Sequence, residues 1–196
     1  MLIWINGAFG SGKTQTAFEL HRRLPGSFVC DPEHLGFGLH RMLPRERRGD
    51  FQDIAAWRQG VHEVLDGLLR EFDGTVIVPM TIVVPEYHRE MFGRLQASGH
   101  EVRHVSLMTS PQTLMRRIHS RGEGRESFAA RRLEHCLTAL REPDFATHLD
   151  TDQLSIASVA EAIADTTGLN LARESGNALT RRAQRWWTTL RHIRFD

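Results

Sequence analysis

The chain has 196 residues, of which 40% are hydrophobic and 25% are charged, as in an ordinary globular domain. These proportions exclude a disordered chain and a polytopic membrane protein, and the length favours a single domain. Because the formal net charge is only +1, the protein is not expected to bind nucleic acid through its overall electric field.

Predicted strands and helices alternate along the chain. Leu2 to Ile5 is an uninterrupted apolar run, which is typical of a strand buried on both faces of a parallel sheet. Thr14 to Leu24 carries apolar residues at helical spacing, and Pro25-Gly26 ends that helix. Further strands are expected at residues 27–30, 75–78 and 102–107, and a fifth is expected to end at His148-Leu149. The alternation predicts an α/β fold with a mostly parallel, helix-covered sheet.

Several residues mark where the later helices begin and end. Ser110-Pro111 predicts an N-cap followed by the first helical residue. Ser158-x-x-Glu161 matches a capping box at the start of the last helix of the fold. Gly99 and Gly168 are expected to end helices, because glycine readily adopts the left-handed conformation found there.

Residues 7–14 read Gly-Ala-Phe-Gly-Ser-Gly-Lys-Thr, which satisfies the phosphate-loop pattern G-x-x-x-x-G-K-[ST] between a predicted strand and a predicted helix. Glycines let backbone N–H groups face a phosphate, and the helix start adds partial positive charge. Lys13 is the only lysine of the chain, and its compact ammonium is expected to reach the β and γ phosphates of ATP. The expected nucleotide contacts are Gly7, Gly10, Ser11, Gly12, Lys13 and Thr14, with Thr14 as a ligand of Mg²⁺.

A candidate catalytic carboxylate follows the second predicted strand. The strand at residues 75–78 has no aspartate where many P-loop ATPases carry the Walker B carboxylate, which argues against a motor ATPase. Asp31 is therefore the candidate to orient magnesium-bound water or to accept a proton from an acceptor hydroxyl. The alternative is an aspartate that only forms a turn before Pro32.

An arginine-rich stretch runs from Arg116 to Arg132 and is interrupted by two glycines. It predicts a hinged basic lid at about residues 117–132, since phosphoryl transfer needs cations over the moving phosphate and exclusion of water. Arg117 and Arg121 are the candidates for charge stabilisation. The alternative is that these arginines lie on a solvated helix face.

Four short strings accompany the phosphate loop. They are Asp31-Pro32-Glu33-His34-Leu35-Gly36, Val78-Pro79-Met80-Thr81, Arg121-Gly122-Glu123 and His148-Leu149-Asp150-Thr151-Asp152. In this order they resemble the tunicamycin-resistance ATP-binding proteins of the TmrB type, within the nucleoside monophosphate kinase-like branch of P-loop proteins. The resemblance implies a three-layer P-loop fold over residues 1–170, with a five-stranded parallel sheet of order 2-3-1-4-5. It also implies ATP-dependent resistance to tunicamycin, a nucleoside antibiotic with a fatty acyl chain.

The resemblance further implies an acceptor-binding region at about residues 32–70. The expected acceptor contacts are Asp31, Glu33, Phe37 and Thr81. Phe37, Leu39, Met42 and Trp57 are expected to offer apolar surface to a uridine or acyl group, and core packing explains these four residues equally well. Thr151 and Asp152 follow the fifth strand, where similar kinases hold adenine, and their alternative is an ordinary turn.

Residues 171–196 form a separate predicted element. Leu179, Ala183, Trp186, Leu190 and Ile193 recur at helical spacing with arginines on the other faces, which predicts a basic amphipathic helix. Leu179–Ile193 is expected to contact an anionic membrane surface, the domain itself or a second subunit in a homodimer. Two cysteines without CxxC spacing favour a cytoplasmic protein, at most peripheral to the inner face of the membrane.

Three functions remain open from the sequence. The first is a phosphotransferase that moves the γ-phosphoryl group of ATP to a hydroxyl of a nucleoside-like or sugar-like acceptor, such as tunicamycin. The second is an ATP-gated protein that binds the drug without modifying it, because the catalytic base is not certain. The third is a kinase for an unrelated small metabolite.

Overall fold

The computed structural model describes residues 1–120, 122, 124 and 127–173. In chain order the elements are β1 (Leu2–Gly7), α1 (Lys13–Arg23), β2 (Ser27–Val29), α2 (Glu33–Met42), η1 (Arg45–Arg47), η2 (Phe51–Asp53), α3 (Ala55–Glu71), β3 (Thr75–Pro79), α4 (Pro85–Ala97), β4 (Val102–Met108), α5 (Pro111–His119), α6 (Phe128–Arg131), α7 (Leu133–Ala139), η3 (Pro143–Phe145), β5 (His148–Asp150) and α8 (Ile156–Thr167).

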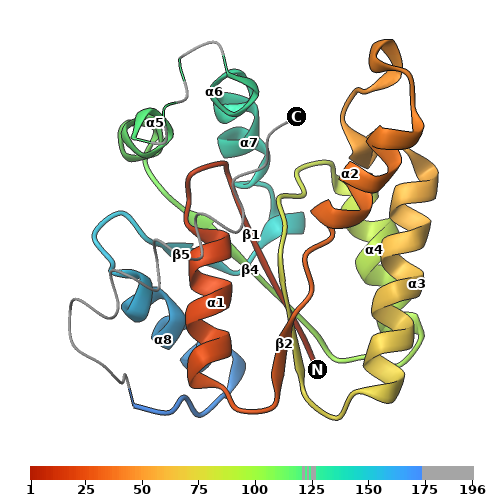
Figure 1. Ribbon diagram of the computed structural model, residues 1–196. Coiled ribbons are helices and arrows are strands. Elements are labelled where there is room, and N and C mark those ends of the chain that lie inside the picture. Colours follow the sequence, from red (N-terminus) through yellow and green to blue (C-terminus); the bar gives the residue numbers. More distant parts are fainter. Residues whose placement is uncertain (121, 123, 125–126, 174–196) are drawn as a thin grey trace.

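The five strands form one parallel sheet of order β2-β3-β1-β4-β5, and this confirms the predicted fold class (Figure 1). β1 lies at the centre, where Ile5 is in register with Pro79 of β3 and with Val105 of β4. All of β1 is buried, in agreement with its continuous apolar run. The loop that follows β1 therefore begins in the middle of the carboxyl edge of the sheet, where ligands of such folds bind.

Alternate residues of β1 face two separate hydrophobic cores, because successive side chains of a strand point to opposite sides. Ile3 and Ile5 pack in the core formed with α1 and α8. Leu2 and Trp4 pack in the larger core, to which α3, α4, α5 and α7 contribute. Figure 1 shows α1 and α8 on one side of the sheet and α3 and α4 on the other. The sheet is thus the middle of three layers, and both of its faces are covered.

Most predicted helix boundaries are confirmed, and one is wrong. Ser110 caps α5 by accepting a hydrogen bond from the backbone N–H of Thr113, and Gly168 follows α8 with a φ of 72°. The predicted capping box at Ser158 is incorrect, because α8 begins one turn earlier. Ser155 is the N-cap, and its Oγ accepts a 3.1 Å hydrogen bond from the backbone N–H of Ser158.

Two further features of the sequence have structural counterparts. Cys30 and Cys136 are free thiols, and burial raises the pKa of Cys30 to about 11, so this thiol stays protonated near neutral pH. Within the described part of the chain, no helix combines the length and the apolar character needed to span a membrane. The predicted amphipathic helix at Leu179–Ile193 lies outside the described residues.

Candidate functional site

The phosphate loop between β1 and α1 has a backbone that requires glycine at two positions. Gly10 has a φ of 83° and Gly12, the N-cap of α1, has a φ of 100°, a region that other residues rarely adopt. A Cβ atom on Gly12 would also lie 3.2 Å from Ile156 Cδ1 of α8. The first N–H groups of a helix have no partner within it, so the start of α1 offers donors to an anion at this loop.

Lys13 lies within the curve of this loop. Its Nζ donates hydrogen bonds to the carbonyl oxygens of Gly7 at 2.9 Å and Ala8 at 3.1 Å, and the residue is only 8% exposed. The ammonium lies 5.7 Å from the centroid of the Phe9 ring. A buried cation is thus held at the centre of the loop, where a phosphate chain would be attracted to it.

Two hydroxyl groups of the loop fit a bound nucleotide and its metal ion. Ser11 Oγ is fully buried and has no hydrogen-bond partner among the described residues, which is costly unless a ligand supplies one. Thr14 is half-buried in the first turn of α1, the place from which a P-loop hydroxyl ligates Mg²⁺. The predicted loop residues therefore lie together in an arrangement that fits a phosphate group with a divalent cation.

Asn6 is a positioning residue that sequence reasoning missed. Its Oδ1 accepts hydrogen bonds from the backbone N–H groups of Gly7 and Ile82 at 2.8 and 3.0 Å, and its Nδ2 donates to the Ile82 carbonyl at 2.7 Å. Thr81 Oγ1 donates to the Gly7 carbonyl at 2.8 Å. The loop after β3 thereby braces the start of the phosphate loop. The signal in the sequence was a buried-strand position occupied by an amide residue, which needs partners.

Of the two predicted lid arginines, one is described. Arg117 lies on α5, is half-buried, and its Nη1 is 3.3 Å from the carbonyl oxygens of both Gly10 and Ser11. These contacts bring a guanidinium to the edge of the phosphate loop. Arg121 lies outside the described residues.

The predicted acceptor residues occupy the neighbouring part of the carboxyl edge. Asp31 follows β2, and its Oδ1 accepts a 3.0 Å hydrogen bond from the backbone N–H of Glu33, the first residue of α2. Glu33 and Phe37 are half-buried on this helix, whereas Trp57 is fully buried and its Nε1 donates to the Pro32 carbonyl at 3.1 Å. For Trp57, core packing is thus the alternative that the structure supports.

Thr151 and Asp152 join the loops that follow β4 and β5. The Thr151 hydroxyl lies 2.8 Å from the Thr109 hydroxyl, and Asp152 Oδ1 accepts a 2.8 Å hydrogen bond from the Ser110 backbone N–H. This bonding to Ser110 lowers the pKa of Asp152, so its carboxylate stays charged near neutral pH. A cavity of about 270 Å³, lined in part by Ser110, Arg141 and Asp152, lies beside this junction.

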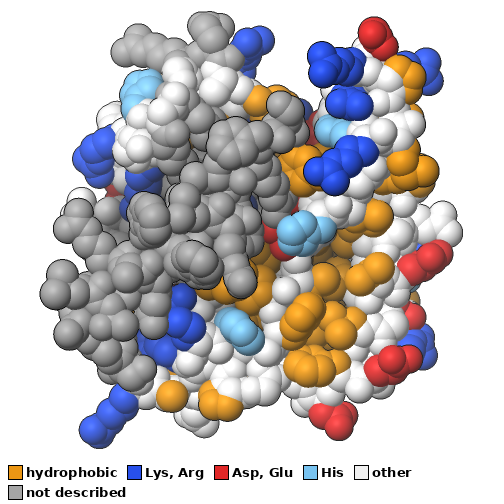
Figure 2. Space-filling view, viewed as in Figure 1, with side chains coloured by type: hydrophobic (Ala, Val, Ile, Leu, Met, Phe, Trp, Pro, Cys, Tyr) orange, Lys and Arg blue, Asp and Glu red, His pale blue; other side chains and the backbone are white. Residues whose placement is uncertain are grey.

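Positive charge gathers on the tip of the predicted acceptor region. Arg41 lies next to Met42, the last residue of α2. Arg45 and Arg47 lie in η1, and Arg48 follows it directly. All of these side chains are exposed, and Figure 2 shows basic side chains clustered at the upper right, over this segment. Although the formal net charge is only +1, the protein therefore has a local basic surface.

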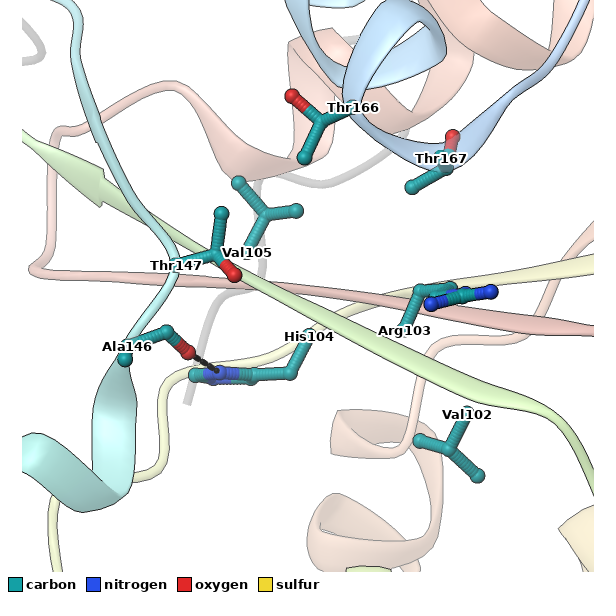
Figure 3. Close-up of a pocket in the computed structure, with 8 residues that line it drawn as sticks. All are labelled: Val102, Arg103, His104, Val105, Ala146, Thr147, Thr166 and Thr167. Carbon is teal, nitrogen blue, oxygen red and sulfur yellow. Dashed lines mark hydrogen bonds between the residues drawn. The ribbon is translucent and has the colours of Figure 1, made fainter.

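A second cavity, of about 240 Å³, lies on the β4 side of the sheet away from the phosphate loop (Figure 3). Thr166 and Thr167 of α8 line one wall, and Val105 and Thr147 point toward them, whereas the His104 side chain points to the opposite face of the sheet. His104 Nδ1 lies 3.1 Å from the Ala146 carbonyl, while Nε2 faces Asn6 Nδ2 at 3.1 Å. Burial lowers the pKa of His104 to about 4, so the ring is neutral and accepts from Asn6.

Comparisons with known proteins identify relatives of the chain. Residues 2–143 match the family model described as AAA domain, and a search of curated protein sequences finds no match. The structure of a tunicamycin resistance protein from Deinococcus radiodurans is 36% identical in sequence and has a TM-score of 0.76. That similarity covers 88% of this chain and 99% of the Deinococcus chain.

More distant structures share the fold. A sugar kinase from a Janibacter species is 17% identical over 86% of this chain and 94% of its own, with a TM-score of 0.62. The Mycobacterium tuberculosis APS kinase, solved with AMPPNP and APS, is 18% identical over 85% and 96% of the two chains, with a TM-score of 0.58. At such identities the likeness shows a kinase-like fold and nothing finer.

Proposed function

Because the chain belongs to the family of the tunicamycin resistance protein, among P-loop proteins with a nucleotide-binding, kinase-like function, we propose that it transfers the γ-phosphoryl group of ATP to a nucleoside-like antibiotic, with tunicamycin as the leading acceptor. The observation that carries the proposal is the phosphate loop. A buried Lys13 ammonium, a buried Ser11 hydroxyl that lacks a partner within the described chain, and the start of α1 all belong to this loop, and together they would bind an anion.

The residues of the loop would bind the triphosphate and stabilise its charge. The N–H groups at the start of α1 and the Lys13 ammonium would bind the β and γ phosphates. Thr14 would supply a hydroxyl ligand to Mg²⁺, which neutralises charge on these phosphates when it is bound. Arg117, at the loop edge, and Arg121 would stabilise the charge on the phosphoryl group during transfer.

The acceptor would bind beyond β2 and β3. Its hydroxyl oxygen would form a bond to the γ phosphorus while the bond to the β–γ bridging oxygen breaks, so that ADP leaves and Asp31 takes the hydroxyl proton. Glu33, Phe37 and Thr81 would contact the acceptor. Thr151 and Asp152 would lie near the adenine. In this assignment residues 1–170 form the kinase-like domain.

A second function is binding of the drug without chemistry, and one observation favours it. Asp31 Oδ1 already accepts a hydrogen bond from the Glu33 N–H, as an aspartate that forms a turn with Pro32 would. A carboxylate that serves only the turn would leave a site that closes around ATP and the drug without transferring the phosphoryl group.

Mass spectrometry of the drug separates the two functions. Purified protein is incubated with MgATP and tunicamycin, and the drug is then weighed. Phosphoryl transfer predicts a drug heavier by one phosphoryl group, which Lys13→Ala and Asp31→Asn should each abolish. An unchanged drug that binds tightly in the presence of MgATP would establish sequestration. An unchanged drug that does not bind would overturn both.

The predicted C-terminal helix adds a proposal about location. We propose that Leu179–Ile193 contacts anionic lipid at the inner face of the membrane, since a basic amphipathic segment with two tryptophans suits that surface. Co-sedimentation with anionic vesicles tests this, with a chain shortened after Ser175 as the control. If both chains sediment equally, the segment does not bind lipid, and docking on the domain or homodimer formation is its role instead.

A further inference from the structure

The short helix α6 touches the phosphate loop through one aromatic pair. The Phe128 ring meets the Phe9 ring edge to face, with centroids 5.6 Å apart at an interplanar angle of 78°. Phe9 belongs to the loop itself and lies beside the Lys13 ammonium. Phe128 is nevertheless 56% exposed, so the pair alone gives α6 little buried surface against the loop.

Arg132, at the junction of α6 and α7, links this aromatic pair to the acceptor side. Its guanidinium carbon lies 5.2 Å from the Phe128 ring centroid, and its Nη1 lies 2.9 Å from Asp50 Oδ2. The two side chains of this ion pair are 30% and 11% exposed, respectively. Because these side chains are partly buried, water and salt screen their attraction less than they would at a fully exposed site. One guanidinium thus contacts both α6 and the turn that contains Asp50.

Asp50 is itself firmly placed on the acceptor side. Its Oδ1 caps η2 by accepting a 3.0 Å hydrogen bond from the Gln52 backbone N–H. The same turn is held by Arg58 Nη1, which donates to the Gln52 carbonyl at 2.6 Å, and by the Tyr87 hydroxyl, which donates to Asp53 at 2.9 Å. The turn is therefore anchored to α3 and α4, and it can serve as a fixed support for Arg132.

We propose that Asp50 and Arg132 are positioning residues: their ion pair holds α6 and Phe128 against the phosphate loop and couples the nucleotide site to the acceptor side. The inference rests on the proposed nucleotide site and extends it to two residues that lie outside the phosphate loop. α6 has only four residues, too few for a helix to keep its place without outside contacts. Moving the η2 turn would move Arg132, and with it the aromatic ring on the loop.

The test uses substitutions that remove the ion pair and keep the local fold. Asp50→Asn keeps an N-cap side chain but loses the charge, and Arg132→Gln removes the guanidinium. Asp53→Asn is the matched control, because Asp53 lies in the same turn and bonds Tyr87 instead of Arg132. All are made in the full-length chain, singly, and Asp50→Asn also together with Arg132→Gln.

Two measurements are made on each protein. Hydrogen exchange is followed at the backbone N–H groups of Arg131, Arg132 and Cys136, which bond within α6 and α7. Affinity for ADP with magnesium is measured by calorimetry. Asp50→Asn and Arg132→Gln are each expected to exchange faster and to bind ADP about fivefold more weakly, the size of a well-placed, partly buried ion pair, whereas Asp53→Asn should behave like the parent protein. The double variant should be no worse than either single one, since both remove the same contact.

The proposal fails if the two substitutions act additively, if Asp53→Asn has the same effect, or if ADP affinity does not change in Asp50→Asn. These outcomes differ from failure of the proposed function. If the unsubstituted protein does not bind ADP, the proposed nucleotide site is wrong, and so is its coupling to the acceptor side. Hydrogen exchange in α6 then still decides whether Asp50 and Arg132 position that helix.

Discussion

Lys13 shows how a single residue type can be tied to one chemistry. The chain uses arginine at its other 24 basic positions and keeps its one lysine in the phosphate loop. There the ammonium donates to two backbone carbonyls inside a narrow curve. A planar guanidinium has a different shape and fixed donor directions, so it would not occupy the same space.

Substitution of Lys13 should therefore impair nucleotide binding. We expect Lys13→Ala to remove a charge-assisted contact worth about 1.5 to 3 kcal/mol and to weaken ATP binding about tenfold or more. Lys13→Arg should recover only part of this loss, because charge is kept while shape is not. Calorimetric titration with ATP and magnesium measures both. An unchanged affinity of Lys13→Ala for ATP would contradict the proposed nucleotide site.

Substitutions of Thr81 can distinguish a role in holding the phosphate loop from a role in binding the acceptor. Its hydroxyl donates to the Gly7 carbonyl and is buried. Thr81→Val keeps the shape but loses this donor, and it should lower the free energy of unfolding by about 1 kcal/mol, whereas Thr81→Ser should keep most of it. Urea unfolding measures the difference. If both variants are as stable as the parent, the hydroxyl does not brace the loop.

At the scale of the element, α8 shows why a cap is hard to place from sequence. Two serines three residues apart both precede apolar residues, and the one with a following glutamate matched the capping pattern. In the structure Ser155 is the cap and Ser158 lies in the first turn. The path of the chain out of β5 decides which serine has the extended backbone that an N-cap needs.

The two serines should respond differently to alanine. Ser155→Ala should cost about 1 kcal/mol of stability, because the backbone N–H of Ser158 loses its acceptor. Ser158→Ala should cost less, since it removes only an exposed contact between the two hydroxyls. Thermal unfolding of both variants gives the comparison. A larger loss in Ser158→Ala would restore the capping box predicted from sequence.

At the scale of the whole molecule, partly buried histidines predict how stability depends on pH. The pKa of His104 is lowered to about 4 by burial, and an unfolded histidine titrates near 6.5. Below pH 6.5 the unfolded chain therefore binds the proton first, so stability falls as the pH drops from 6.5 to 4. His88, whose ring lies 5.0 Å away, also has a pKa lowered by burial and acts in the same direction.

Removal of His104 should flatten this dependence. The full effect of His104 is about 3 kcal/mol between the two pKa values, since each unit is worth about 1.4 kcal/mol. His104→Gln keeps a polar side chain that does not titrate. Urea unfolding at pH 7 and pH 4.5 should show a smaller loss of stability in the variant than in the parent protein. Equal losses would place the titrating group elsewhere.

The sequence alone determined the alternation of strands and helices, the phosphate loop and the family, because these depend on patterns within short stretches of chain. It could not pair Asn6 with Ile82, which lie 76 residues apart, or bury Trp57 beneath Pro32. It also could not bring Arg132 to Asp50. Only the tertiary structure decided these contacts, because the energy of a buried hydrogen bond or ion pair depends on which distant segments the packed sheet and helices bring together.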